Sequence, residues 1–336
     1  MKKSQVSEDE IISAVRDFAY SIHSGRKVNA AMSTLTHMTS QLTFTSFDYW
    51  EGMIRFEYAS AIRECAIPQW KFWSKPQNIL TWLDVISWDG HKREKALRAL
   101  SGPVPNAFFF SLVLRRLNDW VPQVREAAKE KLPEIAKASD PKFVVDTLCA
   151  VLPNWSSWGR IEPSGQAVLL EIMCEKETAE SLRAKLISSP AGPMPSLFSQ
   201  LGRTPILDGR IGEIATCAVQ PSLRAKAYRS LFDCRIVWMA GRKWVWTDKR
   251  YHQGSLKPIL AERKIDAEMP FLTLLKLSSA DPSSIVRRVS AEMLIRELDS
   301  LGSVAKDFAD VFASDKSIAV SERGEFALKK LKEAAY

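Results

Sequence analysis

Apolar residues recur at helical spacing along most of the chain, and the first such stretch begins near the N-terminus. Ser7 and Glu10 stand three residues apart, as in a capping box that starts a helix. Gly25 then marks the end of this helix. The apolar positions between them fall on one helical face: Ile11, Ile12, Val15, Phe18, Ala19 and Ile22.

Two further long helices are predicted before the pattern shortens. One follows Ser46 and ends at Pro68, and the next begins near Pro76 and runs through Ile86. From Asp89 onward, helical stretches of about ten residues alternate with breaks that contain proline, glycine or aspartate. This rhythm of helix, turn and helix predicts an all-α chain.

A single stretch departs from the helical pattern. Residues 236–238 and 244–246 are rich in Val, Ile and Trp, and Ala240-Gly241 lies between them. Two such runs around a glycine are typical of a β-hairpin. We therefore expect a small hairpin near 236–246, inserted between helices.

A short motif recurs in the chain: an arginine, a small residue three positions later and a leucine seven positions later. Its copies are Arg93-Ala96-Leu100, Arg125-Ala128-Leu132, Arg224-Ala227-Leu231 and Arg287-Ser290-Leu294. An aspartate stands six positions before the arginine in two copies, as Asp119 and Asp281. A motif that recurs about once per pair of helices indicates a repeat architecture, in which each pair buries its apolar face against the next.

These copies resemble the HEAT repeats of armadillo-like proteins. In that family an aspartate in the turn and an arginine in the second helix form a hydrogen-bonded ladder between repeats. The resemblance implies a right-handed α-solenoid over residues 76–336, with an insertion at 235–258 and a divergent helical cap at 1–75. It also implies that Asp119, Arg125, Asp281, Arg287, Arg93 and Arg224 are structural ladder residues.

Composition removes several classes of protein. No run of about 18 apolar residues is present, so no membrane-spanning helix and no membrane partner are predicted. The N-terminal residues are polar and acidic rather than apolar, unlike a signal peptide. Five cysteines without a Cys-x-x-Cys pair predict reduced, mostly buried thiols in a cytoplasmic protein.

The segment 235–258 has the most unusual chemistry. Six basic residues face one acidic residue there, in a chain whose net charge is +8. The binding candidates are Arg242, Lys243, Trp244, Trp246, Lys249, Arg250 and Tyr251. Cations interleaved with aromatic rings suit single-stranded nucleic acid, and they suit an acidic protein groove equally well. The third alternative is a hairpin whose tryptophans dock on the helices while its cations face water.

Two other groups are candidates for a binding surface. Trp155 and Trp158 flank a pair of serines in a predicted loop, where they mark either an interface or core packing. Basic residues on successive helices could form a concave basic surface, or simply a solvated face: Lys92, Arg93, Lys95, Arg98, Arg115 and Arg116.

Catalytic, metal and cofactor signatures are missing from the sequence. The four histidines are far apart, and no zinc-protease, nucleophile-elbow or phosphate-loop motif appears. We therefore predict a non-enzymatic scaffold without cofactor that binds a protein partner through a curved, basic and aromatic surface. The alternative is a nucleic-acid-binding HEAT-like protein, similar in kind to the HEAT-like DNA glycosylases. The oligomeric state is left open.

Overall fold

The computed structural model describes residues 6–65, 80–266 and 269–334, and these residues are mostly helical with one two-stranded antiparallel sheet. The chain divides into two compact units, Met1–Ser181 and Leu182–Tyr336. The predicted boundary at residue 75 and the predicted helix start near Pro76 lie outside the described residues.

The first unit contains eight α-helices in its described part, and the boundary between the units falls within a ninth helix. Their bounds are α1 (Glu8–Ser24), α2 (Val28–Thr39), α3 (Phe47–Glu64), α4 (Gly90–Ala99), α5 (Ala107–Leu114), α6 (Pro122–Ala138), α7 (Pro141–Val151), α8 (Pro163–Cys174) and α9 (Lys176–Ser188). Short 3₁₀ segments lie at Phe44–Ser46, Trp82–Ile86, Arg115–Asn118 and Trp155–Ser157.

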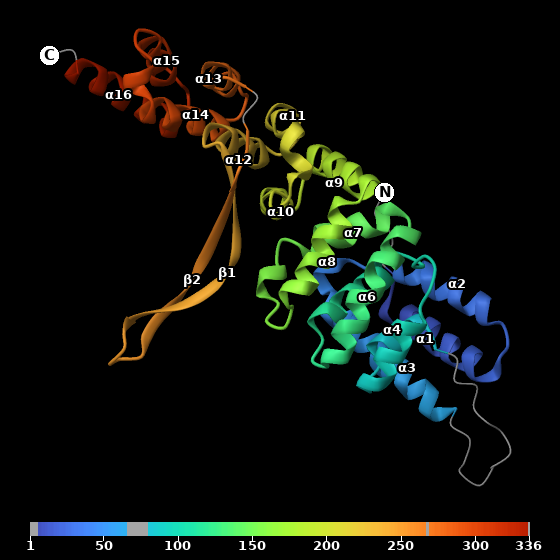
Figure 1. Ribbon diagram of the computed structural model, residues 1–336. Coiled ribbons are helices and arrows are strands. Elements are labelled where there is room, and N and C mark those ends of the chain that lie inside the picture. The colour runs from blue at the N-terminus through green and yellow to red at the C-terminus, as the bar shows by residue number, and fades with distance from the viewer. Residues whose placement is uncertain (1–5, 66–79, 267–268, 335–336) are drawn as a thin grey trace. The chain divides into compact units, whose positions relative to one another are not determined.

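The second unit contains seven further α-helices in its described part and the sheet (Figure 1). Their bounds are α10 (Met194–Leu201), α11 (Ile211–Cys217), α12 (Pro221–Phe232), β1 (Arg235–Asp248), β2 (Gln253–Lys264), α13 (Phe271–Ser279), α14 (Ser284–Arg296), α15 (Val304–Ala313) and α16 (Ile318–Glu333). Two 3₁₀ segments lie at Pro205–Arg210 and Leu298–Ser300.

The N-terminal helices form as the sequence predicts. Ser7 caps α1, and its hydroxyl and the carboxylate of Glu10 exchange hydrogen bonds with each other's backbone N–H groups. Gly25 ends α1 with a φ of 68°, and α3 begins directly after Ser46. The predicted helix up to Ile86 differs, because its described end is a 3₁₀ segment.

The four copies of the recurring motif begin in α4, α6, α12 and α14. In the first unit α4 packs on α6 and α6 on α8, and in the second unit α12 packs on α14 and α14 on α16. The small and leucine positions of the motif are buried in all four copies: Ala96, Leu100, Ala128, Leu132, Ala227, Leu231, Ser290 and Leu294. Small side chains thus let these helices approach, and the leucines fill the space between them.

The hairpin is confirmed, but its predicted turn is wrong. Both predicted strands belong to the single strand β1, and β2 pairs with it antiparallel along its whole length. Ala240 has no partner in the register, because the pairing shifts between Met239 and Gly241. The glycine therefore marks a β-bulge rather than a turn. Pro258 lies within the second strand, and a proline argues against a strand in the sequence. It is tolerated here because both strands of a two-stranded sheet are edge strands.

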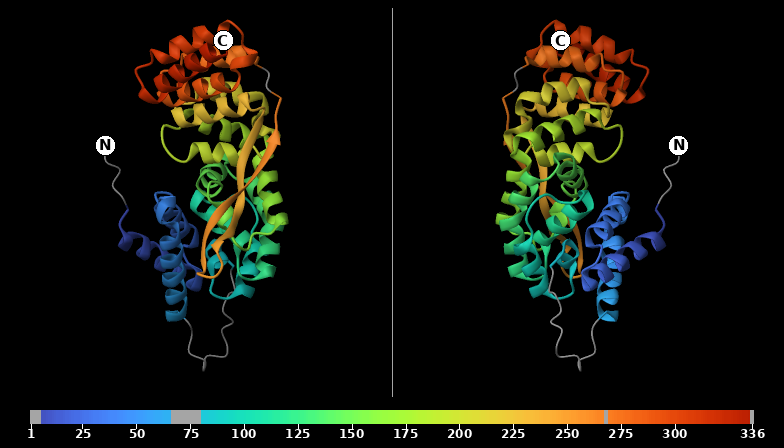
Figure 2. Two further views of the ribbon diagram at one scale, coloured as in Figure 1. Left: turned by 90° about the vertical axis from the view of Figure 1, so that its left-hand side faces the viewer. Right: turned by 90° about the vertical axis from the view of Figure 1, so that its right-hand side faces the viewer.

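The two strands leave the helices of the second unit beside α12 and extend to a distant loop (Figure 1). Both views in Figure 2 show them twisted around each other, as a two-stranded ribbon twists more than a wide sheet. The two strands and their loop therefore span residues 235–264.

Candidate functional site

The four motif arginines each bind a carboxylate of a following segment, and we call these pairs rungs. The pairs are Arg93–Asp119, Arg125–Glu162, Arg224–Asp281 and Arg287–Asp315, with closest nitrogen–oxygen distances between 2.6 and 2.8 Å. In each rung the arginine Nη1 also donates to the carbonyls of the residues six and five positions earlier. Each arginine thus holds its own turn and a neighbouring segment together.

Two rung carboxylates were missing from the sequence prediction. Asp315 accepts from Arg287. It stands six positions before Ser321, which replaces the arginine in a further, degenerate copy of the motif that continues with Gly324 and Leu328. Glu162 accepts from Arg125 and also from Lys129. The six-residue spacing alone could have found Asp315, whereas Glu162 has no such signal.

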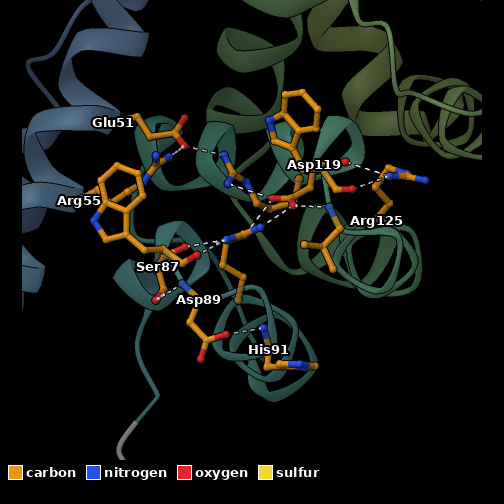
Figure 3. Close-up of polar contacts among 12 residues, drawn as sticks. Glu51, Arg55, Ser87, Asp89, His91, Asp119 and Arg125 are labelled. Carbon is orange, nitrogen blue, oxygen red and sulfur yellow. Dashed lines mark hydrogen bonds and ion pairs between the residues drawn. The ribbon is translucent and has the colours of Figure 1, made fainter.

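Asp119 is the centre of a polar network in the first unit (Figure 3). Its carboxylate accepts hydrogen bonds from Arg93 and Arg116, and also from the backbone N–H of Val121. Burial raises the pKa of Asp119, but the hydrogen bonds from Arg93 and Val121 and the charge of Arg116 outweigh this and lower it. Arg116 then reaches Glu51 of α3 at 2.6 Å.

Glu51 joins α3 to the same network. Its carboxylate accepts from Arg55 at 2.5 Å, in addition to Arg116, and lies 3.4 Å from Arg115. The side chain of Glu51 is buried although it is charged. Several arginines surround it, so the buried charge is compensated as such charges must be.

Two tryptophans occupy the same position in two successive rungs. Trp88 stands five residues before Arg93, and Trp120 stands five residues before Arg125, so each is the outer residue of its turn. They are 67% and 77% exposed. The guanidinium of Arg55 lies 4.8 Å from the ring of Trp88, and that of Arg160 lies 3.1 Å from the ring of Trp120.

These side chains line one cavity of about 540 Å³, which we call the arginine–tryptophan cavity. Three tryptophans and five arginines line it: Trp88, Trp120, Trp158, Arg55, Arg93, Arg115, Arg116 and Arg160. The carboxylates on its wall are Glu51 and Asp119. Five cations against two anions leave the cavity positively charged. A smaller cavity of about 270 Å³ shares Arg55, Ser87 and Trp88 with it.

The paired tryptophans of the sequence prediction separate in the structure. Trp155 is 2% exposed and belongs to the core, whereas Trp158 lines the arginine–tryptophan cavity. The predicted basic surface separates as well. Arg115 and Arg116 line the cavity, but Arg98 pairs with Glu94 and Glu130, and Lys92 lies 2.6 Å from Asp84.

The hairpin presents two different faces, because directly paired residues of a sheet share one face. The register places Met239 opposite Leu260, Arg242 opposite Pro258 and Trp244 opposite Leu256, with Trp246 further along. We call this the apolar face. Leu256 and Leu260 are 59% and 63% exposed, and the two tryptophans are about half exposed. They contact each other edge to face, with 5.5 Å between ring centroids.

The opposite face is basic in its outer part. Lys243 and Lys257 are direct partners across the strands. Like charges in direct opposition destabilise a sheet, so this pair is costly without an anion nearby. Lys249, Arg250 and Tyr251 lie in the loop at the tip, where Tyr251 is highly exposed.

The base of the hairpin is anchored firmly in the second unit. Arg263 binds the carboxylate of Asp208 at 2.6 and 2.8 Å and donates to the carbonyls of Gly202 and Thr204. Ile236 is buried, and Arg203 lies 5.9 Å from the ring of Trp238. At the base, the indole of Trp238 thus lies near a guanidinium, whereas Trp244 and Trp246 stay exposed and do not dock on the helices as the third alternative expected.

Other chemistry is sparse in the described residues. No group of three or more His, Cys, Asp or Glu is arranged to hold a metal ion there, and none of the described helices has the length and apolar character of a membrane span. All five cysteines lie in the described residues and none forms a disulfide, but the prediction that most are buried is wrong. Cys174, Cys217 and Cys234 are exposed because they lie at or just beyond helix ends.

Comparison with known proteins gives no relative for this chain. No family model matches it, and neither a curated protein nor a solved structure matches it.

Proposed function

We propose that the protein is a non-enzymatic interaction scaffold built from HEAT-like repeats, and that its hairpin binds an acidic segment of a partner protein. The observation that carries the proposal is the apolar face of the hairpin. It exposes aliphatic and aromatic side chains beside Arg242, on an element whose base is anchored in the second unit.

The HEAT-like architecture is supported by the spacing of the rungs. Arg93 and Arg287 find their carboxylates 26 and 28 residues later, whereas Arg224 finds Asp281 only 57 residues later. Removing the 30 residues of 235–264 from that separation leaves 27. The hairpin thus accounts for the long separation of the Arg224 rung, whereas the Arg125 rung spans 37 residues. The packing of α4, α6 and α8, and of α12, α14 and α16, supports a solenoid-like stacking of helices within each unit.

The chemistry of the hairpin favours a protein partner over nucleic acid. Phosphates and bases gain little binding free energy from exposed leucines. A protein segment that covers these leucines gains about 25 cal/mol for each Å² of apolar surface removed from water. The cation on the apolar face, Arg242, favours an acidic residue in that segment. The outer edges of both strands also offer backbone groups to which an extended segment can pair.

A capture experiment with matched variants tests this proposal. Tagged protein is incubated with nuclease-treated lysate of its own cells, and the recovered partner is purified and titrated against the wild type and two variants. Leu256→Ser with Leu260→Ser removes the apolar face, while Ile259→Ser changes a neighbouring exposed residue on the opposite face.

We expect the double variant to weaken binding of the partner at least tenfold, because it removes two apolar side chains from the contact. A tenfold loss corresponds to about 1.4 kcal/mol. Ile259→Ser should leave the affinity nearly unchanged. Cross-links between the hairpin and an acidic segment of the partner would complete the evidence. A partner that binds both variants equally, or recovery of no protein from the nuclease-treated lysate, would contradict the proposal.

A further inference from the structure

We propose that the arginine–tryptophan cavity of the first unit is a nucleotide-binding site, in which a base stacks on Trp120 or Trp88 and the phosphate binds Arg160 and Arg55. This inference concerns a different unit and different residues from the hairpin. It therefore does not depend on the proposed protein partner.

The arginines of the cavity have more donors than the carboxylates can satisfy. Arg93 is fully occupied by Asp119 and by two carbonyls. Arg160 forms no ion pair with any described residue. Its guanidinium lies against the ring of Trp120, and its backbone N–H donates to the side-chain oxygen of Asn118. Within the described chain, Arg55 Nε and Arg116 Nε are buried without an acceptor.

An unpaired buried donor costs about 1–3 kcal/mol, so the cluster is short of acceptors rather than of donors. A phosphate group supplies several strong acceptor oxygens, and it matches the planar fork of a guanidinium. Arg160 is the best placed of these arginines to meet it, because no carboxylate of the described residues competes for its charge.

The tryptophans of the cavity are not required by the architecture. The same position in the second unit is held by Val219 and Pro282, and the rungs of Arg224 and Arg287 form equally well there. Trp88 and Trp120 belong to turns whose helices, α4 and α6, pack directly on each other. Two exposed indoles at this spacing, each beside a guanidinium, provide stacking surfaces for bases.

The chemistry of the wall separates this cavity from a peptide groove. Arginine, tryptophan and short polar or acidic side chains line it, and no aliphatic side chain is found among its described lining residues. An acidic peptide would gain charge contacts there but no apolar pocket, in contrast to the hairpin. A volume of about 540 Å³ lies within the usual range of small-ligand sites and accommodates a base with its phosphate.

A nucleotide reaches such a site either free or within a single strand, and two probes distinguish these sources. A fluorescein-labelled oligothymidylate of about twelve nucleotides is titrated by fluorescence anisotropy at several salt concentrations. Unlabelled thymidine monophosphate then competes with it. Equal competition per nucleotide identifies a free nucleotide as the ligand, and failure to compete identifies a single strand.

Variants assign the binding to the cavity. We expect Trp120→Ala to weaken the oligonucleotide about tenfold and Trp120→Phe to recover most of the loss, because the ring is restored. We expect Arg160→Gln to weaken it and to reduce the salt dependence by about one phosphate contact. Trp246→Ala, on the hairpin, is the matched control and should bind as the wild type does.

Three results would overturn the assignment. The wild type could bind neither probe more tightly than the ~10⁻⁴ M of weak non-specific binding. Trp246→Ala could lose as much affinity as Trp120→Ala, which would place the strand on the hairpin. Polyglutamate of matched charge could displace the oligonucleotide as effectively as unlabelled oligonucleotide does, which would show recognition of charge alone. The first and third results leave the protein partner of the hairpin unaffected, whereas the second would count against both proposals.

Discussion

The rungs of the two units share one geometry but carry different residues on their outer turns. In the first unit the carbonyls that accept from Arg93 and Arg125 belong to Trp88 and Trp120. In the second unit the equivalent carbonyls belong to Val219 and Pro282. The rung constrains the backbone of this turn and leaves its side chain free to vary.

The difference shows that the rung tolerates different side chains at this position of its turn. The first unit places aromatic residues on its own turns and surrounds them with arginines. The second unit keeps plain turns and carries its exposed tryptophans on an inserted hairpin. The insertion leaves the rung beneath it intact, since Arg224 still binds Asp281 with two hydrogen bonds of 2.8 Å.

The largest effect is expected from breaking that rung. Arg224→Met leaves Asp281 buried and unpaired, because both side chains are about nine-tenths buried. Removing one partner of a buried pair costs about 3–5 kcal/mol. Urea unfolding of the variant should show a loss of this size.

The control is Arg229→Met on the same helix, because Arg229 pairs with Glu292 at the surface. Exposed pairs contribute about 0–1 kcal/mol, so this variant should unfold almost as the wild type does. Equal losses in both variants would show that the rung has no special weight in the second unit.

A smaller effect is expected at the last, degenerate copy of the motif. Gly324 holds its small position, and a Cβ added there would lie 2.1 Å from the backbone nitrogen of Ala313. Gly324→Ala should therefore destabilise the α15–α16 pair by about 1–3 kcal/mol, although alanine favours helices. Gly52→Ala in α3, where nothing lies within 4 Å, is the control and should not destabilise the protein. Equal stability of both variants would show that the two helices can separate at little cost.

Local chemistry explains how much of the fold could be predicted. The capping box at Ser7 and the arginine positions of the motif are local signals, so the sequence contains them directly. The partner of β1 is not local in this sense, since it depends on a bulge near Gly241 and on a proline in an edge strand. Periodicity alone therefore misplaced the turn of the hairpin.

The site was harder to predict than the fold. Trp88 and Trp120 each stand five residues before a motif arginine, so the sequence does contain this pattern. The position is exposed, however, and hydrophobic periodicity identifies only buried positions. Arg55 and Arg160 reach them from distant parts of the first unit. No local pattern predicts such a meeting, whereas the charge of 235–258 is visible in the sequence itself.

Acid should weaken rungs in both units by a smaller amount. Hydrogen bonds from Arg287 lower the pKa of Asp315 below its ordinary value of 3.8, and the pKa of Asp119 is lowered too. A carboxyl with a lowered pKa stabilises the folded state above the ordinary pKa, and this contribution is lost as the pH falls through the folded value. Each group should contribute on the order of 1 kcal/mol.

Urea unfolding at pH 7 and near pH 3 measures this contribution. The stability difference between the wild type and Asp315→Asn should shrink on acidification, because the protonated aspartic acid resembles the amide. The same should hold for Asp119→Asn. A difference that stays constant with pH would mean that the lowered pKa values are not a property of the folded protein.

The smallest effect on stability should come from exchanging the outer residue itself. Trp120→Val gives the first unit the side chain that Val219 carries in the second. The rung uses the carbonyl of this residue and its side chain is largely exposed, so unfolding should change by no more than about 0.5 kcal/mol. The same variant should lose about tenfold in oligonucleotide affinity. Strong destabilisation would instead make the indole part of the fold, and unchanged affinity would remove the functional difference between the two kinds of turn.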